Sequence, residues 1–259
     1  MFRLVTALVL GTTALLAHPS DSRDTDFLVP QMKIGDHFSN VFSIASSIKA
    51  DGFDELVRRN SGSADYTLRQ ASSDRALTFD VPGVYDGSPI DRSEDIIRDG
   101  GATSCWNGKC RVYTDASGLL YNRLLWGDPP TALKAGVVWK VTIHQPWELG
   151  PAGIQTVTVM HVDESDGTVT LKREGTASGF FADEPTQVTL VKNGEKIQMD
   201  VTPGQAHWTG YTTFRHGIVI SDELLVTRAD KLTSKETGSI DAARRRYMLL
   251  NAAPYPTLE

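Results

Sequence analysis

Cysteine is scarce in this chain, with only Cys105 and Cys110 among 259 residues. Four residues separate them, whereas a redox-active pair is typically a Cys-x-x-Cys motif, so we do not expect redox chemistry. Asn107-Gly108 between them is a strong signal for a type I′ hairpin turn. That turn would make the cysteines opposite partners with Cα atoms about 4.5 Å apart, which suits a disulfide. The sequence therefore predicts a disulfide that pins one hairpin.

An excess of basic residues is also lacking. The chain has 26 Lys and Arg against 32 Asp and Glu, a net charge of −6. This balance argues against a nucleic-acid partner. The one basic cluster, Arg244-Arg245-Arg246, is flanked by Asp241 and precedes the apolar residues 247–250. We interpret the cluster as a solvated strand entrance, with a site for an anionic ligand as the alternative.

Short catalytic motifs are absent. The sequence has no Gly-x-Ser-x-Gly elbow, because Ser178 comes one position too late after Gly175, and no His-Glu-x-x-His pair, phosphate loop or dinucleotide fingerprint. His144, His161, His207 and His216 are not expected to converge on a metal, so no metal and no cofactor are predicted. A hydrolase remains an alternative, since such sites are often assembled from distant strands.

No apolar run is long enough to cross a membrane as a helix. The longest, residues 4–16, falls short of the roughly 20 residues required. With Arg3 before it and Ala17 after it, this run is typical of a signal peptide over residues 1–17. Residues 18–26 are polar and expected to be disordered. We therefore expect an exported protein without a transmembrane segment, in the periplasm or outside the cell.

Helix signals are few, whereas strand signals recur. Residues 53–59 place Phe53, Leu56 and Val57 on one helical face and predict a short helix; residues 38–50 fit helix or strand. Asn193-Gly194 predicts a hairpin with the pairs Lys192–Glu195, Val191–Lys196, Leu190–Ile197 and Val188–Met199. Asp166-Gly167 predicts another, with the pairs Val162–Leu171 and Met160–Arg173, whose first strand is apolar on both faces and so covered on both sides.

Further short strands are separated by Gly, Pro, Asn and Asp. They are expected at residues 66–70, 76–81, 137–143, 209–214, 218–220, 224–227 and 247–250. The fold class is mainly β, with antiparallel sheets as a curved sheet, sandwich or partial barrel, and one or two short helices near the N-terminus. Two prolines, Pro129 and Pro130, predict a boundary between an N-terminal β-rich region, 27–130, and a C-terminal antiparallel region, 131–259.

Loops at strand ends and aromatic side chains supply the candidate site residues. The loop from His144 through Trp147 and Glu148 is one group, and the others are Trp139, His207, Trp208 and Asp222. Core packing is the alternative role for the tryptophans.

Three functions follow from these observations. The favoured one is non-catalytic binding of a small apolar or amphipathic ligand, or of a protein partner, on a curved sheet whose concave face includes Trp139 or Trp208. The second is an exported hydrolase that uses His144, Glu148, His207 and Asp222. The third is an envelope scaffolding component with an exposed apolar patch or an open sheet edge.

Overall fold

The computed structural model describes residues 27–72, 76–90, 93–98, 101–106, 108–113, 119–130, 132–182 and 184–251. The predicted signal peptide and the predicted disordered residues 18–26 lie outside these ranges. The described chain is mostly strand, with one short helix, α1 (Arg123–Trp126). The strands are β1 (His37–Ala50), β2 (Leu56–Ala71), β3 (Leu77–Asp80), β4 (Gly83–Tyr85), β5 (Ser88–Ile90), β6 (Ser93–Arg98), β7 (Gly101–Trp106), β8 (Lys109–Tyr113), β9 (Val138–Ile143), β10 (Gly153–Asp163), β11 (Thr168–Ser178), β12 (Gln187–Lys192), β13 (Glu195–Arg215), β14 (Ile218–Ser234) and β15 (Gly238–Leu250).

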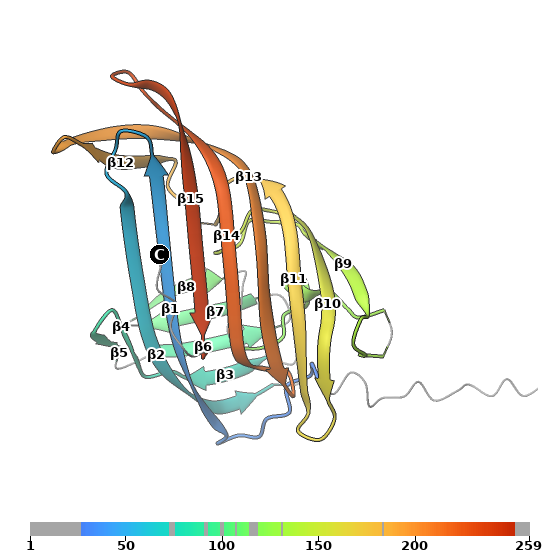
Figure 1. The fold of residues 1–259 in the computed structure, drawn as a ribbon. Coiled ribbons are helices and arrows are strands. Elements are labelled where there is room, and N and C mark those ends of the chain that lie inside the picture. The colour runs from blue at the N-terminus through green and yellow to red at the C-terminus, as the bar shows by residue number, and fades with distance from the viewer. Residues whose placement is uncertain are drawn as a thin grey trace, which may run out of the picture.

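These strands form one open antiparallel sheet of 15 strands, which confirms the predicted fold class in the form of a curved sheet (Figure 1). The main order is β8-β7-β6-β3-β2-β1-β15-β14-β13-β11-β10-β9, with β12 paired to β13 and β4 and β5 beside β2. The sheet bends so strongly that β3 and β6–β8 lie behind β1, β15 and β14 (Figure 1). No helix in the described residues is long and apolar enough to cross a membrane.

The bend gives the sheet two different faces. We call the face that packs against α1 and the loop after β9 the inner face, and the opposite one the outer face. Along β13, inner residues such as Met199, Trp208 and Phe214 are buried, while His207 and Thr209 between them are exposed. Alternation of this kind is what a strand with one covered face requires.

Three clusters of buried apolar side chains fill the inner face. The largest lies over β9–β11 and β13–β15 and includes Trp126 and Trp147 from the connections. A second lies between the β12–β13 hairpin and β1, around Leu190 and Met199. The third lies over β2, β3, β6 and β7, around Leu68 and Phe79. The inner face, on the concave side of the bent sheet, is therefore apolar, as predicted. The chain's own side chains, however, pack against it.

The predicted helix at residues 53–59 is wrong. Leu56 begins β2, which pairs with β1 from Ile48–Leu56 to His37–Thr67, and the described helix is α1, further along the chain. Phe53 and Leu56 still pack against the core, but beside β12 and β13. The apolar spacing was compatible with either structure, and pairing with β1 decided it. Residues 38–50, left open between helix and strand, form β1.

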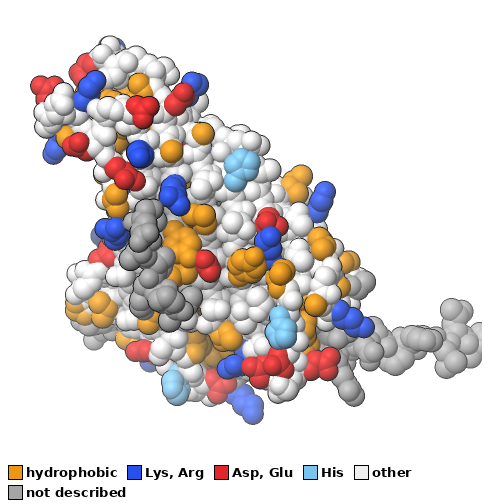
Figure 2. Space-filling view, viewed as in Figure 1, with side chains coloured by type: hydrophobic (Ala, Val, Ile, Leu, Met, Phe, Trp, Pro, Cys, Tyr) orange, Lys and Arg blue, Asp and Glu red, His pale blue; other side chains and the backbone are white. Residues whose placement is uncertain are grey.

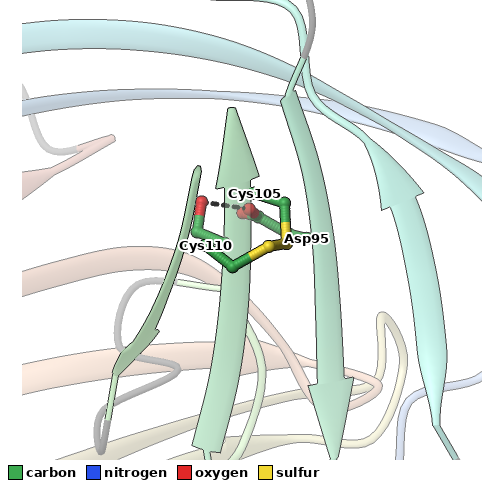
Figure 3. Close-up of a disulfide and its surroundings, with 4 residues drawn as sticks. Asp95, Cys105 and Cys110 are labelled. Carbon is green, nitrogen blue, oxygen red and sulfur yellow. Dashed lines mark hydrogen bonds between the residues drawn. A yellow bond between two sulfur atoms is a disulfide. The ribbon is translucent and has the colours of Figure 1, made fainter. Parts of the chain in front are cut away.

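The hairpin at Asn193-Gly194 has the predicted register, from Lys192–Glu195 to Val188–Met199. The disulfide hairpin is also confirmed, with Cys105 opposite Cys110 and their Cα atoms 4.0 Å apart (Figure 3). Asp95 on β6 lies on the strand next to β7, which carries Cys105 (Figure 3).

The register predicted for the hairpin at Asp166-Gly167 is wrong. Val162 pairs with Val169 and Val159 with Leu171, because the turn is longer than two residues and Met160 lies in a bulge. The Asp163 carboxylate accepts hydrogen bonds from the Ser165 amide and hydroxyl and so shapes the longer turn. The prediction that β10 is covered on both faces is wrong as well, since Ile154 is 57% exposed.

Several strands are much longer than predicted. The segments 218–220 and 224–227 are parts of one strand, β14, and β13 runs from Glu195 through Pro203 to Arg215. Pro203 lies at a bulge, where the register with β14 shifts by one residue. A bulge tolerates the proline, which cannot donate to the ladder.

The sequence boundary near Pro130 separates α1 from β9. Strands from both sides of it belong to the same sheet, because β1 pairs with β15 from Phe42–Leu250 to Ala50–Ala242. The division into regions 27–130 and 131–259 stays a prediction.

Candidate functional site

The three predicted tryptophans lie in the main core. Trp139 on β9 donates its indole N–H to the Trp126 carbonyl at 2.6 Å. Trp208 on β13 donates to the Gln155 side-chain oxygen at 2.9 Å. Trp147 is fully buried and meets Trp208 edge to face, with ring centroids 6.4 Å apart. These contacts match the core-packing alternative, and a ligand-contacting role for Trp139 and Trp147 stays a prediction.

Asp222 is the acid of a buried ion pair. Its carboxylate accepts two hydrogen bonds from Arg173, at 2.7 and 2.9 Å, and one from the Thr212 hydroxyl at 2.6 Å. The Arg173 guanidinium also lies over the rings of Trp126 and Trp147, at 5.0 and 5.5 Å from their centroids. Asp222 is therefore occupied in holding a buried cation in the core.

The four residues of the hydrolase hypothesis do not come together. Asp222 is on the inner face, His207 points outward from the sheet, and His144 is exposed after the end of β9. Glu148 is half-buried in the following loop, where its backbone carbonyl accepts a hydrogen bond from Arg246. A general acid and base must lie within hydrogen-bond reach of the same bond, and His207 and Asp222 are separated by the sheet.

The basic run 244–246 is divided between the two faces. Arg244 and Arg246 point inward, where Arg244 pairs with Glu184 and Asp230, and Arg228 pairs with the same two acids. Phe181 lies between Arg228 and Arg246, whose guanidinium carbons are 4.5 and 5.1 Å from its ring centroid. Burial lowers the pKa of Arg246. This network fixes the connection between β11 and β12 to the sheet. The prediction that residues 244–246 are a solvated strand entrance therefore holds only for Arg245, which is exposed.

A depression of about 750 Å³ lies on the outer face over β9, β10, β11, β13 and β14. Its lining combines hydroxyl, apolar and charged side chains. They are Thr156, Thr176, Thr209, Thr227, Ile154, Leu225, Lys140, Glu174 and His207, with Gly153, Gly175 and Trp208. We call this site the outer depression.

Two glycines on the strands beneath the outer depression make room for core side chains on the inner face. A Cβ at Gly175 would lie 2.0 Å from the Trp208 ring, and one at Gly153 would lie 2.4 Å from the Ala177 Cβ. Neither position can carry a side chain without a shift of its neighbours, and at Gly175 the indole of Trp208 fills that space on the core side of the sheet. Trp208 and His207 are the two predicted site residues that this depression brings together.

The charges at the outer depression are partly paired. Lys172 contacts Glu174 at 2.8 Å, and this hydrogen bond raises the pKa of the lysine ammonium. Within the described ranges, no group of three or more His, Cys, Asp or Glu side chains is arranged to hold a metal ion. The lining thus offers threonine hydroxyls, apolar contacts and the charged side chains of Lys140 and Glu174.

No family model and no curated protein matches this chain. Among solved structures it is similar to a lipovitellin structure described for its lipid–protein interactions, at 9% identity and a TM-score of 0.40. That match covers 88% of this chain and 27% of the lipovitellin chain. Another is OmpF of Salmonella typhi in complex with daunomycin, at 7% identity and a TM-score of 0.21. That match covers 84% of this chain and 98% of the OmpF chain. Likenesses this distant carry no inference about the present chain.

Sequence reasoning missed most of the outer depression. Threonines on successive strands are ordinary surface residues in the sequence, and only strand order and register place them side by side. One signal was available: Gly153 and Gly175 lie within strand-like segments, where glycine often marks a close approach of another group.

Proposed function

We propose that this protein binds an amphipathic molecule in the outer depression. The observation that carries the proposal is the lining, in which four threonine hydroxyls lie among the apolar side chains of Ile154 and Leu225. The volume of about 750 Å³ is that of a small-molecule site. Hydroxyls can bond a polar part of the ligand, while the apolar side chains cover its hydrocarbon.

The proposal includes export of the protein. The signal-like N-terminal sequence and the Cys105–Cys110 disulfide support it, because disulfides persist in oxidising compartments. The ligand would then be met in the periplasm or outside the cell.

The scaffolding alternative receives less support. β9 ends the strand order on one side and exposes Val138, which is 52% accessible. Its exposed centre, however, is Lys140, and a lysine there discourages pairing with another strand.

The test is a titration of the purified protein with an uncharged fluorescent amphiphile, nitrobenzoxadiazole-labelled monoacylglycerol, below its aggregation concentration. Wild-type protein should bind it saturably. Thr209→Trp fills the middle of the depression with a residue that strands favour, and should weaken binding about tenfold or more.

The matched control is Thr233→Trp. Thr233 is exposed on the outer face of β14 but does not line the depression. It should leave the affinity unchanged. Absence of saturable binding to the wild type, or an equal loss in both variants, would overturn the proposal.

A further inference from the structure

A second hollow lies on the outer face, over β1, β2 and β15. It has a volume of about 230 Å³ and is lined by Lys49, Arg59, Arg245 and Glu55 around Ser47, Val57 and Ala243. We call it the basic pocket. Figure 2, which shows the outer face, has several basic side chains on the part of this face formed by these strands. The volume suits a group of the size of phosphate or sulfate better than a whole amphiphile.

The cations of the basic pocket have no acidic partner among the described residues. None of Lys49, Arg59 and Arg245 forms an ion pair in the part of the chain that the structure describes. By contrast, Arg173, Arg228 and Arg244 on the inner face are all paired with acids. Three cations and one acid around a small hollow leave an excess of positive charge, which favours an anionic guest.

The strand register joins the basic pocket to the outer depression. His207 pairs with Thr227, and Thr227 pairs with Arg245. Arg245 in turn pairs with Ser47, and Ser47 pairs with Val57. The register therefore forms one row across the outer face, in which Thr227 is the last residue of the depression and Arg245 the first of the pocket.

This row fixes the distance between the two sites. Adjacent strands are spaced about 4.8 Å apart, so β13 at the centre of the depression and β15 at the pocket are separated by about 10 Å along the sheet. An acyl or other apolar chain of ordinary length can lie in the depression while a charged group at its end reaches Arg245.

We propose that the ligand is an anionic amphiphile, whose phosphate or sulfate group binds in the basic pocket while its apolar part lies in the outer depression. This assignment rests on the proposed function and adds the class of ligand to it. Arg245 contacts the anion from the side of the depression, and Lys49 and Arg59 contact it from β1 and β2.

The experiment compares two probes that differ only in the head group: the labelled monoacylglycerol and the lysophosphatidic acid with the same labelled chain. Wild-type protein should bind the phosphate probe about tenfold more tightly or better, and added NaCl should reduce this preference. Arg245→Gln and Arg59→Gln should each reduce the preference and leave binding of the uncharged probe intact, which also shows that the variants fold.

Lys231→Gln is the matched control, because Lys231 lies on the outer face of β14 outside both sites and pairs with Asp241. It should keep the full preference. Inorganic phosphate should compete with the phosphate probe only at much higher concentration, because it lacks the apolar part.

The outcomes separate the two proposals. Equal affinity for both probes, or a preference that survives Arg59→Gln with Arg245→Gln, overturns the anionic assignment and leaves the proposed function standing. If neither amphiphile binds but inorganic phosphate does so through Arg245, the pocket is a site for a free anion, and both proposals are wrong.

Discussion

Arg245 and Thr227 are register partners on β15 and β14, and both point to the outer face, one into the basic pocket and the other into the outer depression. Their Cα atoms are therefore separated only by the spacing of two paired strands. Two hollows that could be unrelated surface features thus adjoin each other. This adjacency leads to the first prediction.

Thr227→Trp should place a bulky ring at the junction of the two hollows. We expect it to weaken binding of the labelled lysophosphatidic acid about tenfold, because one molecule can no longer extend across both sites. Binding of inorganic phosphate in the basic pocket, measured with the protein immobilised, should persist. Loss of phosphate binding together with the amphiphile would contradict the adjacency.

Arg173→Met should leave the Asp222 carboxylate buried without its cation. Removal of one partner of a buried pair costs about 3–5 kcal/mol, and urea denaturation measures this loss of unfolding free energy. Arg173→Met combined with Asp222→Leu should cost clearly less than the sum of the single changes. Additive costs would show that the two side chains do not depend on each other.

Gly175→Ala should introduce a Cβ that overlaps the Trp208 ring, 2.0 Å away in the native arrangement. We expect a loss of about 1–3 kcal/mol, typical of overpacking. In a Trp208→Phe background the same glycine substitution should cost less, because the smaller ring leaves room. An equal cost in both backgrounds, measured by thermal unfolding, would show that the ring does not restrict this position.

Asp95→Asn should raise stability at neutral pH. Burial raises the pKa of Asp95, although the Ser104 hydroxyl, 2.5 Å away, lowers it, and no cation pairs with Asp95 in the described chain. A folded-state pKa above the unfolded value means that this carboxylate destabilises the fold once both states are ionised. The penalty disappears as the pH falls toward the ordinary pKa of an aspartate.

The measurement for Asp95 is unfolding free energy between pH 3.5 and 7. The difference between Asp95→Asn and the wild type should be largest at pH 7 and shrink as the solution is acidified. The asparagine still accepts the hydrogen bond from Ser104. A variant less stable than the wild type at pH 7 would contradict this account.

Cys105→Ala with Cys110→Ala should cost only about 2 kcal/mol, since the bond closes a very small loop. Circular dichroism should show that the sheet persists, because β7 remains paired with β6 as well as with β8. Complete unfolding of the double variant at room temperature would show that the disulfide does more than pin a hairpin.

Local patterns determined much of this fold. Asn-Gly turns placed the register of β12 with β13 and of β7 with β8, because a two-residue turn leaves one geometry for the flanking strands. Turn signals alone gave the wrong strand register or strand end where the chain forms a longer turn or a bulge instead. Asp163 and Ser165 build a longer turn, and Pro203 is carried by a bulge inside β13 instead of ending a strand.

The candidate site depended on tertiary structure. By itself, the sequence determined an antiparallel β protein with one disulfide hairpin, since alternation and turn chemistry act over a few residues. Pairing between distant strands decided the rest. It determined which face each residue of 244–246 takes, and it placed Arg245 beside Thr227 and Ser47. The physical reason is that a one-residue change of register moves every side chain of a strand to the other face. This register is set by partners as distant in sequence as Phe42 and Leu250.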